Sequence, residues 1–209
     1  MKKIFFTLAV MIFALAHLRA QTTTQVQPKG IYKEIDVDRH NKAIEILKGD
    51  NKALKQRTVD SILKNPNYYN PPVIYALSKE LFSQDKKGKA TYWFYVAQLR
   101  ARYDANLCLD NTAKQGVSTL NSYYGPDINK YAFQNIDSLE KAVNRVIDFV
   151  KSNDENYDHR WLSLHGMDAF GDGKEKDLSK PKDQWSDIKK KTIDDYQKGF
   201  VEFLETQKK

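Results

Sequence analysis

The sequence has only one cysteine in its 209 residues, Cys108. A single thiol cannot form an internal disulfide, so the fold must be stabilised by the burial of apolar side chains. Cys108 lies between Leu107 and Leu109. We interpret it as a small buried apolar side chain rather than as a reactive thiol.

Long apolar runs are also scarce, and the one that occurs is at the start of the chain. Lys2 and Lys3 precede an apolar stretch over residues 4–16, and a short polar step leads to Ala20. A basic head, an apolar centre and a small residue at the cleavage point are typical of a secretory signal peptide. The stretch is shorter than the roughly 20 residues of a membrane-spanning helix. We therefore expect residues 1–20 to be removed, with cleavage at the end of the apolar stretch as the alternative, and no permanent membrane anchor to remain.

An excess of charge of one sign is missing as well. Three of the 34 Lys and Arg residues lie in residues 1–20, which hold no acidic residue, so the rest of the chain, with 27 acidic residues, has a net charge of only +4. Acidic and basic residues are mixed along most of this part, whereas nucleic-acid-binding proteins gather basic residues on one face or tail. We expect no nucleic-acid partner, and a location in the periplasm or outside the cell.

Strict alternation of apolar and polar residues, the mark of a half-buried strand, extends over no long segment. Apolar residues recur instead every three or four positions, most clearly at Leu139, Val143 and Val146. This spacing places them on one face of a helix. We predict an all-α fold, either a helical bundle or a short array of helical hairpins.

Helix start and stop signals indicate a single domain. Residues 21–33 are expected to form a flexible lead and residues 34–209 the helical domain. A mobile loop is expected near residues 171–181, which hold two glycines and six charged residues. Helices are predicted over about residues 36–48, 54–63, 71–83, 89–105, 137–150 and 183–204.

The third and fourth predicted helices carry one recognisable pattern. Ala90, Phe94 and Ala97 are spaced so that small residues let two helices approach closely while an aromatic ring fills the groove between them. Over about residues 71–104 the hairpin resembles a unit of the tetratricopeptide or Sel1-like repeat family. Ser78 replaces a smaller residue of the family pattern, and we find no second copy. The resemblance implies a concave surface that binds a protein or peptide.

Two arginines, Arg100 and Arg102, interrupt the predicted helix over residues 89–105, which is otherwise largely apolar. A guanidinium on such a helix must find a carboxylate or reach water, so one interpretation is internal pairing. The functional interpretation is an arginine-and-aromatic groove that grips a peptide carboxylate or another anion through bidentate hydrogen bonds and ring stacking.

A second segment, residues 158–167, is dense in side chains that make specific contacts. It could line a cleft, or its apolar residues could hold a connecting segment against the core. The candidate binding residues are therefore Arg100, Arg102, Tyr92, Tyr95, Tyr103, Trp161 and His165.

Complete catalytic and metal-binding motifs are lacking. His159 and His165 are six residues apart, not the four that place two zinc ligands on one helix face. We predict no catalytic residue, no metal and no cofactor. The leading hypothesis is an exported helical protein that binds a peptide or partner protein, as an adaptor or an immunity-type protein. The alternative is a small cell-envelope hydrolase with a carboxylate pair, Asp158 with Glu155 or Asp168.

Overall fold

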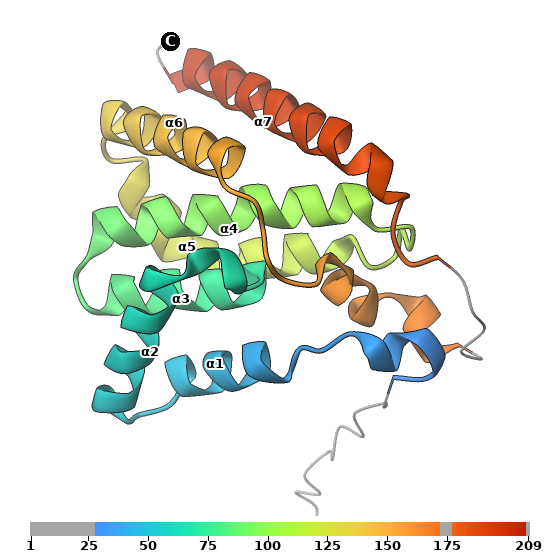
Figure 1. Cartoon of the computed structure of the whole chain (residues 1–209). Helices are drawn as coiled ribbons and strands as arrows, with labels where there is room; N and C mark the ends of the chain where they lie inside the picture. Colours follow the sequence, from blue (N-terminus) through green and yellow to red (C-terminus); the bar gives the residue numbers. More distant parts are fainter. Residues whose placement is uncertain (1–27, 172–176, 208–209) are drawn as a thin grey trace, which may run out of the picture.

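The chain folds into α-helices, as predicted, in the computed structural model, which describes residues 28–171 and 177–207 (Figure 1). These two ranges contain no β-strand beyond an isolated bridge between Cys108 and Ser179. The predicted signal peptide, residues 1–20, lies outside the described residues. The α-helices are α1 (Asp38–Lys48), α2 (Lys52–Lys64), α3 (Pro71–Ser83), α4 (Lys87–Leu107), α5 (Gln115–Ala132), α6 (Ile136–Ser152) and α7 (Trp185–Gln207).

Helix α4 is the centre of the fold and packs against α3, α5, α6 and α7 (Figure 1). Its apolar residues lie on every side, so it can be buried only when neighbours surround it. The helix is two residues longer at each end than predicted. In its hairpin with α3, Ala90, Phe94 and Ala97 are all completely buried. The resemblance of this hairpin to a known repeat family stays a prediction.

Asparagine side chains cap the starts of three helices. Oδ1 of Asn51 accepts a hydrogen bond from the amide of Leu54 at 3.0 Å, and Asn70 begins α3 in the same way. In α6 the cap is Asn135, whose Oδ1 accepts from the amide of Ser138 at 2.9 Å. This cap lies two residues before the expected start of the helix. Each such cap satisfies one of the backbone donors that a helix start leaves unpaired.

Helix α5 was not predicted, because Gly125 and Pro126 break the apolar pattern in its interior. The structure explains the glycine: a Cβ atom at position 125 would lie 3.0 Å from Cζ of the Phe94 ring. Absence of a side chain therefore lets α5 approach α4 closely at that ring. Pro126 is exposed on the outer side of α5. The approach matters because it places the last turn of α5 beside α4.

The segment between α6 and α7 is fixed to α4 by one buried carboxylate, that of Asp104. Its oxygens accept hydrogen bonds from Oη of Tyr157 at 3.1 Å and Nε1 of Trp161 at 2.6 Å, and they contact Nδ1 of His159 at 2.6 Å. Trp161 and His159 belong to the 3-10 helix η3 (His159–His165). These contacts agree with the interpretation that this segment is held against the core.

The start of the helical domain packs against the segment that precedes α7. Tyr32, in the 3-10 helix η1 (Gly30–Glu34), is 1% exposed and forms a small second core with Ile35, Ala169 and Leu178. The expected flexible lead therefore differs from the structure at its end, since Tyr32 has apolar neighbours far along the chain. Residues 172–176 of the expected mobile loop lie outside the described residues. Leu178, which follows these residues, accepts a hydrogen bond at its carbonyl from the amide of Leu109 at 3.1 Å.

Candidate functional site

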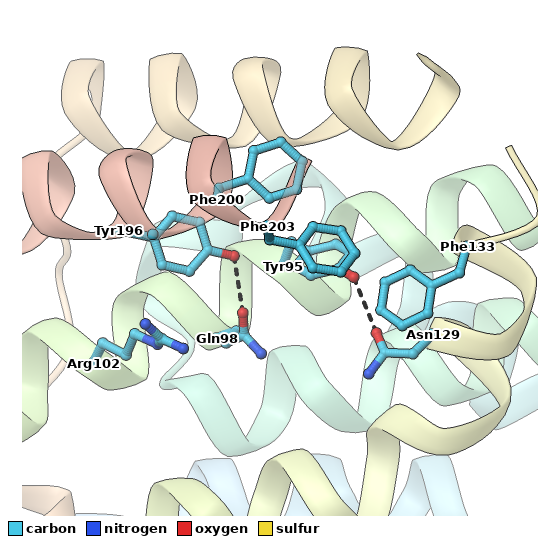
Figure 2. A pocket seen from close by; sticks show the side chains of 9 residues that line it. Tyr95, Gln98, Arg102, Asn129, Phe133, Tyr196, Phe200 and Phe203 are labelled. Carbon is cyan, nitrogen blue, oxygen red and sulfur yellow. Dashed lines mark hydrogen bonds between the residues drawn. The ribbon is translucent and has the colours of Figure 1, made fainter. Parts of the chain in front are cut away.

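An aromatic groove of about 300 Å³ lies between α4, the end of α5 and the second half of α7 (Figure 2). Its lining comes from these three helices, of which α7 is distant in sequence from the other two. The groove is lined by Tyr95, Gln98, Arg102, Asn129, Phe133, Tyr196, Gly199, Phe200 and Phe203. We call it the aromatic groove below.

Two hydrogen bonds between helices hold the tyrosines of the aromatic groove in place (Figure 2). Oη of Tyr95 donates to Oδ1 of Asn129 at 3.0 Å, and Oη of Tyr196 donates to Oε1 of Gln98 at 2.9 Å. Burial raises the pKa of Tyr95 to about 12 and that of Tyr196 further. Both phenols are therefore neutral near pH 7, and the groove contains no phenolate that would repel an anion.

Among the described residues, Arg102 is the only charged side chain that lines the groove, and it is exposed. Its Cζ lies 5.1 Å from the centroid of the Tyr196 ring. Over residues 28–171 and 177–207, no Asp or Glu oxygen lies within 4.0 Å of its side-chain nitrogens. Ring stacking thus positions a guanidinium whose donors remain available for a carboxylate.

The opposite end of the aromatic groove is formed by phenylalanines. The rings of Phe133 and Phe203 have centroids 5.4 Å apart, and those of Phe200 and Phe203 are 6.1 Å apart. Phe133 is 46% exposed. A solvent-exposed phenylalanine beside a cavity is costly to leave hydrated, so the arrangement suits an apolar side chain of a ligand.

Arg100, the other predicted arginine, lies elsewhere and is completely buried. Its Nε is 3.4 Å from Oε1 of Glu155, and its Nη atoms donate to the carbonyl of Pro66 and to Oδ1 of Asn67. Oε2 of Glu155 accepts from Nζ of Lys189 at 2.9 Å. Arg100 is therefore the centre of an internal charge network and cannot reach a ligand in the aromatic groove.

The other predicted binding residues are dispersed. Tyr92 packs against Trp93 and Phe149. Tyr103 has its ring 5.3 Å from that of His159. Trp161 donates to Asp104, and the ring of His165 lies 5.9 Å from that of Trp161. Of the seven predicted residues, the structure brings Arg102 and Tyr95 into the groove and leaves Arg100, Tyr92, Tyr103, Trp161 and His165 outside it.

The carboxylates considered for hydrolysis have other partners. Glu155 is held by two cations, as described above. Asp158 accepts hydrogen bonds from the amide and guanidinium of Arg160; although burial opposes ionisation, these bonds and the charge of Arg160 hold the pKa of Asp158 below its ordinary value. The amide of Asp168 donates to Oδ2 of Asp110 at 3.2 Å, beside a different cavity. A carboxyl group that stays ionised cannot act as a general acid near pH 7.

Sequence reasoning missed most of the groove for two reasons. Tyr196, Phe200 and Phe203 carry a clear helical spacing in the sequence, but this spacing is equally typical of an internal apolar face. Asn129 lies in the last turn of the unpredicted helix α5, and Phe133 directly follows that helix. The sequence does carry one signal for Phe200 and Phe203. They lie at the aromatic-rich end of a predicted helix whose other side is polar.

Comparisons with known proteins give no relative for this chain. Neither models of protein families, nor curated proteins, nor solved structures gave a match.

In the described ranges, no helix is both long and apolar enough to cross a membrane. Nor do the described His, Cys, Asp and Glu side chains gather in groups of three or more suited to a metal ion.

Proposed function

We propose that this protein is an exported, non-enzymatic peptide-binding protein, an adaptor or immunity-type protein, whose aromatic groove holds one end of a partner chain. The observation that carries the proposal is the exposed guanidinium of Arg102 beside a groove of aromatic side chains, with no carboxylate partner in the described part of the chain. The volume, about 300 Å³, is at the small end of the range for ligand pockets. It therefore suits one or two side chains better than a large cofactor.

The chemistry of the groove favours a peptide that ends in an apolar or aromatic residue. Arg102 would receive the terminal carboxylate through two parallel hydrogen bonds, which is the geometry that a guanidinium supports best. Phe133 and Phe203 would contact the last side chain of the peptide at the other end of the groove. The amide groups of Gln98 and Asn129, already positioned by the two tyrosines, lie between these ends.

The hydrolase alternative receives less support. Of the carboxylates that it invokes, Glu155 is paired with Arg100 and Lys189, and Asp158 is paired with Arg160. The resemblance of the α3–α4 hairpin to a peptide-binding repeat points in the same direction as the groove.

The test is a comparison of two fluorescein-labelled peptides that end in Leu-Phe, one with a free carboxylate and one with an amidated end. We expect the mature protein to bind the free acid about tenfold more tightly, since hydrogen bonds to a charged group contribute about 1.5–3 kcal/mol. Arg102→Ala should abolish this difference. Arg57→Ala, which removes an exposed arginine on α2, is the matched control and should preserve it.

Two results would contradict the proposal. One is equal affinity for the two peptides in the wild-type protein. The other is a preference for the free acid that Arg102→Ala leaves intact. If the peptide test supports the proposal, capture experiments with the native envelope fraction should identify the natural partner. Arg102→Ala and Arg57→Ala would serve as the paired baits.

A further inference from the structure

Another cavity, of about 330 Å³, lies where α1, α2, α3 and α5 meet. It shares no lining residue with the aromatic groove. Three lysines and two tyrosines contribute to its lining, and Leu47 and Ala76, each 4% exposed, form an apolar part of its wall. We call it the lysine–tyrosine groove.

Two of its lysines converge on one ring. Nζ of Lys79 lies 4.6 Å from the centroid of the Tyr123 ring and Nζ of Lys48 lies 5.5 Å from it. Tyr123 is 55% exposed. Lys48 comes from α1 and Lys79 from α3, so the ring holds two like charges from different helices near each other. Attraction of each ammonium to the ring partly offsets their mutual repulsion.

Neither of these two lysines is neutralised by an acidic residue of the described chain, since no carboxylate oxygen lies within 4.0 Å of either Nζ. The third lysine differs. Nζ of Lys55 lies 2.6 Å from Oε2 of Glu80, and Glu80 also accepts hydrogen bonds from Ser83 and Gln84. Glu80, the one acidic residue among the described lining, is therefore already paired, and the charges of Lys48 and Lys79 make this part of the groove positive.

We propose that the lysine–tyrosine groove binds an acidic segment of a protein partner. One carboxylate side chain would pair with Lys48 and another with Lys79, while an apolar side chain between them would contact Leu47 and Ala76. An extended segment with the pattern acidic–x–apolar–x–acidic meets both requirements, because alternate side chains of an extended chain share one face. A membrane surface presents its charges on a plane and cannot place an apolar group in this recessed wall, so charge and shape together favour a peptide. The proposal does not depend on the aromatic groove.

The test uses the full mature protein and a labelled ten-residue peptide with a central Glu-Ser-Leu-Ser-Glu, together with the same peptide carrying Gln-Ser-Leu-Ser-Gln. We expect fluorescence anisotropy to give about tenfold tighter binding of the Glu peptide at low salt, with the difference shrinking toward 0.3 M salt as the charges are screened. The double variant Lys48→Ala and Lys79→Ala should remove most of the difference. Tyr123→Phe should keep it, because the ring and not the hydroxyl group holds the ammonium groups.

The matched control is the double variant Lys151→Ala and Lys198→Ala, which removes the same charge from exposed positions on α6 and α7. It should bind the Glu peptide as the wild type does.

Equal loss in both double variants would overturn the proposal, because binding would then follow net charge alone. Equal affinity for the Glu and Gln peptides, or binding to phosphatidylglycerol vesicles without binding to the Glu peptide, would overturn it as well. Arg102→Ala should leave binding of the Glu peptide unchanged, which separates this site from the aromatic groove.

Discussion

Arg100 and Arg102 are the same residue type, two positions apart on one helix, yet they meet opposite environments. Two helical positions correspond to about 200° of rotation, so the side chains leave α4 on nearly opposite sides. Arg100 enters the interior and is completely buried between Glu155, Asn67 and the carbonyl of Pro66. Arg102 reaches solvent beside Tyr196.

The difference shows how a helix can use one kind of side chain for structure and for binding. A buried guanidinium must be paired and hydrogen-bonded, and satisfying it consumes the donors that a ligand would need. An exposed guanidinium keeps its donors and contributes little to folding. The arginine that is available to a ligand is therefore the one that matters little for stability. Ligand affinity and the free energy of unfolding can be measured separately for each arginine.

The largest expected effect comes from breaking the buried network. Arg100→Met should lower the free energy of unfolding by about 3–5 kcal/mol, because it leaves the carboxylate of Glu155 buried with only Lys189 as a partner. Denaturation by urea, followed by circular dichroism, measures the change. The double variant Arg100→Met and Glu155→Gln should lose less than the sum of the single losses, since it removes the unpaired charge. A loss below about 1 kcal/mol for Arg100→Met would contradict the central place of this network.

The contrast between the two arginines could not have been predicted from the sequence. Both stand among the same tyrosines on a largely apolar helix, and what distinguishes them is contributed by distant segments. Asn67 is 33 residues from Arg100, and Glu155 lies beyond α6. Only the packing of α6 and η2 (Pro66–Tyr68) around α4 decides which guanidinium is enclosed. The sequence did indicate that internal pairing was one of the two possible environments.

The helices were easier to predict than the groove, for a physical reason. Start signals such as Asn70 followed by Pro71, and repeating apolar residues as in α6, act within one helix, so they can be read locally. The aromatic groove depends on the close approach of α5 to α4 at Gly125 and Phe94. Read locally, Gly125 argues against a helix. In the folded protein, the same glycine lets the helix pack closely against α4.

A smaller effect is expected from Asp104, the buried acidic residue of α4. Burial opposes protonation of His159, but the charge and hydrogen bond of Asp104, aided by Glu155 and Asp158, outweigh it and raise the pKa of His159 above its ordinary value. A raised pKa in the folded state stabilises the fold fully below about pH 6.5, the unfolded value, and this contribution is lost as pH rises through the folded pKa.

The prediction is read from the difference in unfolding free energy between the wild type and His159→Gln, measured by urea denaturation from pH 5 to pH 9. The difference should be largest at low pH and decline as pH rises. His40 supplies the opposite control, since burial, followed by the charge of Arg39, lowers its pKa against a smaller influence of Asp36. Relative to the wild type, His40→Gln should therefore gain stability below about pH 6.5. A pH-independent difference for His159→Gln would remove Asp104 as the cause.

The smallest expected effect is that of Arg102→Ala on stability, and it completes the comparison with Arg100. The side chain is exposed and its one described partner is the Tyr196 ring, so the cost should be about 0.5–1 kcal/mol, the value of an exposed cation–π contact. A double-mutant cycle with Tyr196→Leu isolates that contact, and its coupling energy should account for most of the loss. A loss as large as that of Arg100→Met would mean that Arg102 also supports the fold. Its donors would then not be free for a carboxylate, and the two arginines would share one structural role.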